Sequence, residues 1–137
     1  MADEAVLVQL REATLFQVTV ANGTGIEKGA ILKIADPNTV SVAGTDNDAV
    51  IGIAAEEKIA SDGKVQIAVY LRGIFKGTAG AAGVTAGDKL IIDSSTGDDN
   101  EIVVADATSA HIMGIALETA TDLQTFKFLL QTGSGQP

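Results

Sequence analysis

The chain carries one sequence pattern twice, and this internal repeat is the feature that most limits its possible folds. Residues 39–54 align without a gap with residues 101–116, at an offset of 62 residues. Residues 25–34 align with residues 83–92 at an offset of 58 residues. The repeat keeps mainly Val, Ile, Gly and Ala, whereas its acidic residues and the single histidine vary between the copies. It therefore predicts two copies of one structural unit and does not mark a catalytic site.

Short apolar runs bounded by turn residues predict β-strands throughout both copies. Hydrophobic residues make up 46% of the 137 residues but aromatic residues only 4%, so we expect an aliphatic core. The chain has no cysteine, which excludes disulfides and sulfur metal sites. The predicted strands lie at residues 14–20, 30–35, 39–43, 50–55, 65–71, 89–92, 102–105, 112–117 and 125–130.

Each half thus offers about four strands and little helix, and four short strands rarely bury a core alone. We therefore predict an all-β fold, a small, tulip-like β-barrel built from two pseudo-symmetric repeats. The Gly/Ala-rich residues 77–83 are expected to form the loop between the repeats. The predicted divisions are an N-terminal arm at 1–17, a barrel domain at 18–130 with repeats at about 25–76 and 83–130, and a flexible tail at 131–137.

Two glycines recur at equivalent places inside apolar strands. Gly52 and Gly114 each precede an Ile-Ala pair in their copy of the repeat. A strand glycine marks either a bulge or a close approach of neighbouring backbone. We predict that both are structural glycines of the repeat.

The formal net charge of −9 restricts the possible partners. Such a charge repels nucleic acid and anionic membrane surfaces, so neither is an expected partner. No apolar run approaches the roughly 20 residues that a membrane-spanning helix needs. The N-terminal residues 1–4 are acidic in part and lack a secretory pattern, so we expect a protein made without a signal peptide.

The residues that could carry chemistry do not form a recognisable site. The acidic segment 93–101 departs from a calcium-binding EF-hand loop, because its glycine is at the fifth place and no helices flank it. We interpret this segment, and the weaker pair Asp46 and Asp48, as solvated turn residues, with cation binding left open. His111 is the single histidine and is expected at a strand end or on the surface.

Other familiar motifs are also incomplete. Gly23, Gly25 and Gly29 do not have the dinucleotide-binding spacing, and no helix is expected after them. Neither half supplies the Asp-Thr/Ser-Gly turn of aspartic proteases, and Lys28 and Lys58 lack the sequence context of biotin- or lipoyl-carrying lysines. The sequence therefore predicts no catalytic, cofactor-binding or metal-binding residues, and a protein that is not an enzyme.

Several segments resemble the head decoration proteins of tailed phages and, more broadly, small phage capsid cement proteins. The first is Ala-Val-Ile-Gly-Ile-Ala-Ala at 49–55, followed by an alternating strand ending in Tyr-Leu-Arg-Gly-Ile-Phe at 70–75. Ala-Gly-Asp-Lys-Leu at 86–90 and Met-Gly-Ile-Ala at 113–116 are similar to the broader family. The similarity covers roughly residues 20–130. The chain differs from the decoration proteins in having a full second repeat and no Pro-rich N-terminal segment.

The resemblance implies a non-enzymatic virion protein, made in the host cytoplasm, that binds the outside of an assembled capsid and stabilises it. Its partner would be the shell of major capsid protein, and family members commonly form homotrimers. Family members also use an N-terminal arm to engage the shell. The residues that the resemblance assigns to such a capsid-contact arm are Val6, Leu7, Val8, Leu10, Leu15 and Phe16.

Two other functions remain open from the residues alone. One is a different virion β-module, in a tail or baseplate. The other is a small barrel that binds a small ligand or a sugar. The apolar N-terminal residues likewise have two interpretations, a short edge strand or frayed terminus and an arm that docks on a neighbour.

Overall fold

In the computed structural model, residues 15–43, 49–93, 101–104 and 111–131 are described, and their secondary structure is all β. This confirms the predicted all-β fold with little helix. In the described part of the chain, no helix is long and apolar enough to cross a membrane. The strands are β1 Leu15–Thr19, β2 Ile31–Asp36, β3 Thr39–Val42, β4 Val50–Ala54, β5 Gln66–Tyr70, β6 Arg72–Ala79, β7 Lys89–Asp93, β8 Glu101–Val104, β9 Gly114–Ala116 and β10 Thr125–Gln131.

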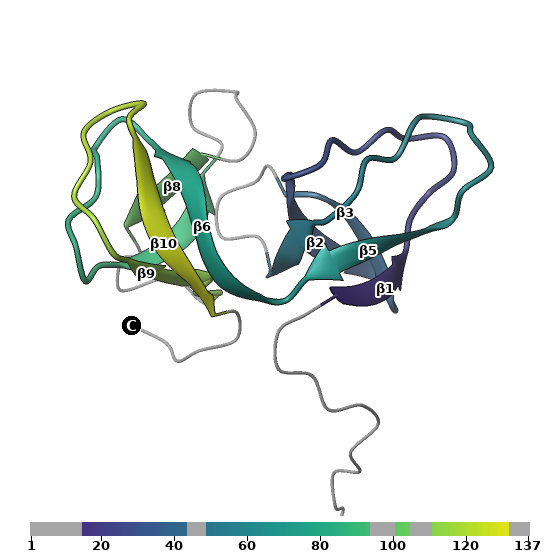
Figure 1. The fold of residues 1–137 in the computed structure, drawn as a ribbon, viewed down its shortest axis with the longest axis horizontal. Coiled ribbons are helices and arrows are strands. Elements are labelled where there is room, and N and C mark those ends of the chain that lie inside the picture. Colours follow the sequence, from purple (N-terminus) through teal and green to yellow (C-terminus); the bar gives the residue numbers. More distant parts are fainter. Residues whose placement is uncertain (1–14, 44–48, 94–100, 105–110, 132–137) are drawn as a thin grey trace, which may run out of the picture.

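The strands form two closed five-stranded barrels that lie side by side (Figure 1). Barrel 1 contains the strands of residues 15–70 in the order β1-β3-β2-β4-β5. Barrel 2 contains the strands of residues 72–131 in the order β10-β6-β8-β7-β9. Strand for strand, β6, β7, β8, β9 and β10 take the places of β1, β2, β3, β4 and β5. The two pseudo-symmetric repeats are thus confirmed, but each repeat closes a barrel of its own where one barrel built from both repeats was expected.

The strand registers make the correspondence between the barrels residue-specific. Phe16 pairs with Val69 in barrel 1, and Phe75 pairs with Phe128 in barrel 2. Both barrels close through a short parallel contact, Thr19 with Thr39 in barrel 1 and its counterpart between β6 and β8 in barrel 2. The other strand pairs are antiparallel.

Strand β6 also differs from the sequence prediction, which placed a loop at 77–83 and about four strands in each half. The strand extends to Ala79 and starts directly after Leu71, so one residue separates β5 from β6. Packing requires the glycine at position 77 of this strand. A Cβ atom on Gly77 would lie 2.5 Å from Cδ1 of Ile102 and 2.9 Å from Cε1 of Phe128. The absence of a side chain at Gly77 therefore makes room for the core of barrel 2.

The two barrels share an apolar interface. One buried cluster fills barrel 1, and a second fills barrel 2. The second cluster also includes four residues of barrel 1, namely Ile31, Ala43, Val50 and Ile53. Strands β2 and β4 are therefore buried on both faces over part of their length, which explains why residues 50–55 form a nearly continuous apolar run.

Candidate functional site

The structure describes two of the six predicted arm residues. Val6, Leu7, Val8 and Leu10 lie outside the described residues. Leu15 and Phe16 belong to β1, where the whole strand pairs with β5. These two side chains therefore belong to the body of barrel 1, at the point where the predicted arm would leave it.

Leu15 and Phe16 differ in their surroundings. Leu15 is 43% exposed. Phe16 is half-buried and packs against the core of barrel 1. The ring also lines a shallow hollow of about 470 Å³, together with Ile51, Leu71 and Arg72. We call Phe16, Ile51 and Leu71 the barrel 1 patch.

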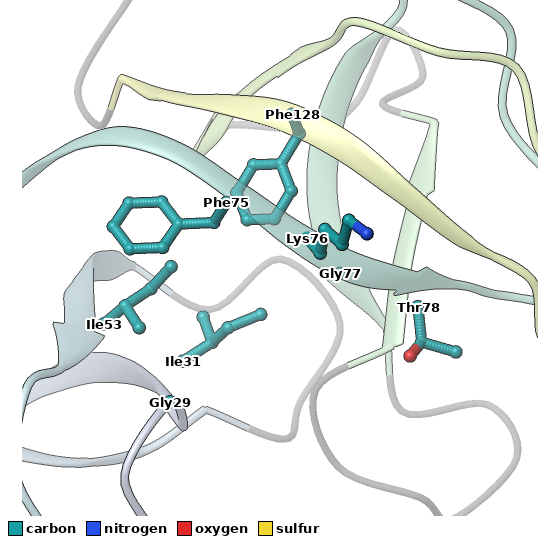
Figure 2. A pocket seen from close by; sticks show the side chains of 8 residues that line it. All are labelled: Gly29, Ile31, Ile53, Phe75, Lys76, Gly77, Thr78 and Phe128. Carbon is teal, nitrogen blue, oxygen red and sulfur yellow. The ribbon is translucent and has the colours of Figure 1, made fainter.

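A second hollow, of about 220 Å³, lies between the barrels. Figure 2 shows Phe75 of barrel 2 directed toward Ile53 of barrel 1, with Ile31 beside it. The rings of Phe75 and Phe128 are 6.2 Å apart, a distance at which tilted rings attract each other. Among the described lining residues, Lys76 and Thr78 carry the polar side-chain groups. The hollow thus belongs to an apolar interface and has no arrangement of acid, base and nucleophile.

The repeated glycines lie where neighbouring backbone comes closest. A Cβ atom on Gly52 would lie 2.4 Å from the carbonyl oxygen of Tyr70. A Cβ atom on Gly114 would lie 2.1 Å from the carbonyl oxygen of Leu129. A register shift also occurs next to Gly52, between Leu32 and its neighbour in β2. Both positions therefore require glycine for close backbone approach, and β4 has an irregularity there as well.

The titratable residues in the described part of the chain do not come together in a reactive cluster. Within the described ranges, no three His, Cys, Asp or Glu side chains lie close enough to hold a metal ion. His111 is exposed. Asp46, Asp48 and residues 94–100 lie outside the described residues. The titratable side chains of the described ranges therefore provide no three-ligand metal site.

Lys58 is buried and hydrogen-bonded, which its sequence context did not predict. Its side chain is 1% exposed, although it lies in a charged connection. The Nζ atom donates hydrogen bonds to the carbonyl oxygens of Asn22 at 2.9 Å and Ile59 at 2.6 Å, and to Oδ1 of Asp62 at 2.7 Å. Its three N–H donors are thereby satisfied, and the ammonium group joins two loops at one end of barrel 1. Ala120 occupies the equivalent place in the second repeat. This difference between the two repeats is the sequence feature that could have indicated a special role for Lys58.

Two carboxylates near this end of barrel 1 have lowered pKa values. The hydrogen bond from Lys58 is the main cause of the lowered pKa of Asp62, and the backbone N–H of Lys64 adds to it. The pKa of Glu56 is lowered chiefly by its hydrogen bond with Lys64, whose own pKa is raised by the same contact. Ion pairing of this kind stabilises the charged forms and indicates a structural role for these groups.

Among solved structures, the fold is similar to the crystal structure of the N-terminal base of the head fiber protein gp8.5 of bacteriophage phi29. The TM-score is 0.56 at 19% sequence identity, and the match covers 88% of this chain and 95% of that chain. No curated protein matches the sequence. The model of the phage cement protein family matches residues 10–130, nearly the whole chain, and the chain therefore belongs to the phage cement protein family.

Proposed function

We propose that the protein binds the outside of an assembled phage capsid and stabilises it, without catalysing a reaction. The observation that carries this proposal is the family match over residues 10–130. The geometry agrees with it, because the described residues build two closed barrels with a shared apolar interface and no reactive cluster. The protein would be made in the host cytoplasm and would join the virion at the surface of its shell.

Rigidity is the physical requirement of such a role. A cement protein holds neighbouring shell subunits through many modest contacts, and repetition of these contacts around a capsid gives avidity. The interface between the barrels supports this requirement, since Ile31 and Ile53 of barrel 1 are each only 4% exposed. We further propose a homotrimer, by analogy with the family.

The N-terminal arm is the proposed contact with the shell. Leu15 and Phe16 start the first strand of barrel 1, and Leu15 is exposed at this end of the strand. An apolar arm that becomes ordered on binding loses conformational entropy, and its attachment then depends on a suitable shell surface. The proposed arm is the part of residues 1–17 that precedes β1, with Val6, Leu7, Val8 and Leu10 as its outer apolar contacts.

Binding to shells that lack the protein tests this function. Purified protein should cosediment with assembled shells and raise their resistance to heat. Deletion of residues 1–13 should abolish cosedimentation and leave the melting temperature of the protein unchanged. Deletion of residues 132–137 is the matched control and should retain binding. If the intact chain neither binds the shells nor changes their stability, the proposal is wrong.

A further inference from the structure

The two barrels differ in how well equivalent apolar surfaces are covered. In barrel 2, Met113 and Leu130 are completely buried and belong to the same cluster as Ile31 and Ile53 of barrel 1. Phe75 packs against this cluster at the groove between the barrels. We call Phe75, Met113 and Leu130 the barrel 2 patch. Barrel 1 therefore contributes to the apolar surroundings of this patch.

The barrel 1 patch is made of the equivalent positions. The strand registers relate Phe16 to Phe75, and they likewise relate Ile51 to Met113 and Leu71 to Leu130. Ile51 and Leu71 are half-buried and line an open hollow. Among the described residues, no third barrel takes the place that barrel 1 has beside barrel 2.

The opposite side of the interface shows the same contrast. Ile31 and Ile53 of barrel 1 face barrel 2 and are each 4% exposed. Their counterparts in barrel 2 are Lys89, which is exposed, and Ile115, which is half-buried. Each surface of the interface between the barrels therefore has a less covered equivalent elsewhere on the same molecule.

We propose that a second copy of the chain packs head to tail on the first, with its Ile115 surface against the barrel 1 patch. Two different surfaces that complement each other form a heterologous contact, which repeats from copy to copy. Ile115 takes the place of Ile53, and the aliphatic stem of Lys89 takes the place of Ile31 with its ammonium group at the solvent edge. This contact rests on the proposed homotrimer, whose interface it would supply when three copies close into a ring, and it does not depend on binding to the shell.

Mixing two variants tests the contact in the full-length protein. Ile51→Glu places a charge in the barrel 1 patch, and Ile115→Glu places one in the opposite surface. The wild type should be oligomeric at micromolar concentration by light scattering, and each variant alone should be monomeric. A 1:1 mixture of the variants should form a dimer, because it retains one intact contact. Leu123→Glu is the control, since Leu123 is 61% exposed on another loop and should keep the wild-type mass.

Several results would overturn the proposal. These are a monomeric wild type, a wild-type mass for Ile115→Glu, or a mixture that stays monomeric. If a monomeric wild type becomes oligomeric after deletion of residues 1–13, the N-terminal segment covers the patch instead. Thermal unfolding of each variant verifies its fold, and if either variant is unfolded, Ile51→Thr and Ile115→Thr replace the pair. The milder pair should weaken association by at least tenfold.

Discussion

Barrel 1 is filled by fully buried aliphatic side chains, whereas barrel 2 contains two buried phenylalanine rings. Phe126 and Phe128 of barrel 2 take the places of Ile67 and Val69 in barrel 1. Across the sheet, Gly77 of barrel 2 takes the place of Val18. The larger rings are therefore matched by a smaller residue beside them, which keeps the packed volume of the core similar. The two copies of the unit thus have the same topology and differ in which of two neighbouring strands carries the larger side chains.

The two barrels also differ in charge, at equivalent turns in the loops at one end of each barrel. In barrel 1, Asp62 accepts a hydrogen bond from the backbone N–H of Ile59 and pairs with the buried Lys58. In barrel 2, Gln124 accepts the equivalent backbone hydrogen bond from Thr121 at 2.9 Å, next to the buried Ala120. The turn is conserved between the repeats, but barrel 1 adds an ion pair that barrel 2 replaces with a small apolar residue.

The largest expected effect comes from emptying the aromatic core of barrel 2. Phe128→Ala should lower the free energy of unfolding by about 4 kcal/mol, because it removes a buried ring and leaves a cavity. Val69→Ala is the matched change in barrel 1 and should cost about 2 kcal/mol, because fewer buried carbons are lost. Urea unfolding measures both. Equal losses would show that the two cores do not differ as described.

Adding a methyl group at the repeated glycines should have the next largest effect. Gly114→Ala should cost about 3 kcal/mol, since the new Cβ would meet the backbone of β10 and force the strands apart. Gly52→Ala should cost slightly less, because its nearest backbone oxygen is farther away. Gly23 has no atom within 4 Å of an added Cβ, so Gly23→Ala is the control. If thermal unfolding shows that Gly23→Ala loses as much stability as the other two variants, the packing argument is wrong.

Removing the buried ammonium group of barrel 1 should have a moderate effect. Lys58→Met keeps an unbranched side chain but leaves the carbonyl oxygens of Asn22 and Ile59 without this donor. We expect a loss of about 2 kcal/mol in the free energy of unfolding. Lys28→Met changes an exposed lysine and should cost less than about 0.5 kcal/mol. Similar results for both lysines in urea unfolding would contradict the structural role of Lys58.

The smallest effect is a pH dependence that belongs to barrel 1. The pKa of Asp62 in the folded protein is below its ordinary value of 3.8, so the folded state favours the charged carboxylate. The resulting stabilisation is fully present above that ordinary pKa and is lost as the pH falls through the folded pKa. Asp62→Asn should therefore flatten the fall of the melting temperature below about pH 4. An unchanged acid profile for this variant would exclude Asp62 as a cause.

Most strands could be predicted from the sequence because their apolar residues alternate or form short runs between turns. Strand β6 could not, because its glycines produce no such pattern and are typical of loops. Gly77 must be glycine because the ring of Phe128, 51 residues later in the sequence, occupies the space that a side chain would need. Local sequence patterns do not contain information of this kind, since it depends on which strands become neighbours.

The features of the candidate site could be predicted from the sequence to different extents. The absence of a catalytic motif and the family resemblance both follow from residues that are close in sequence. The role of Lys58 does not, because a lysine in a charged connection is ordinarily solvated. The outer faces of Ile31 and Ile53 are apolar in the sequence, but their burial depends on where the second barrel lies.

The construction of barrel 1 from one continuous stretch of chain has a consequence for synthesis of the protein. Because barrel 1 uses only strands that precede Leu71, all five of its strands leave the ribosome before β6 follows. Barrel 1 can therefore close while the second repeat is still being translated, as domains generally fold in order of synthesis. The outer apolar face of barrel 1, with Ile31 and Ile53, then remains exposed to water until β6 and β10 have been synthesised and pack against it. The order of the repeats along the chain thus sets how long this apolar face stays exposed during synthesis.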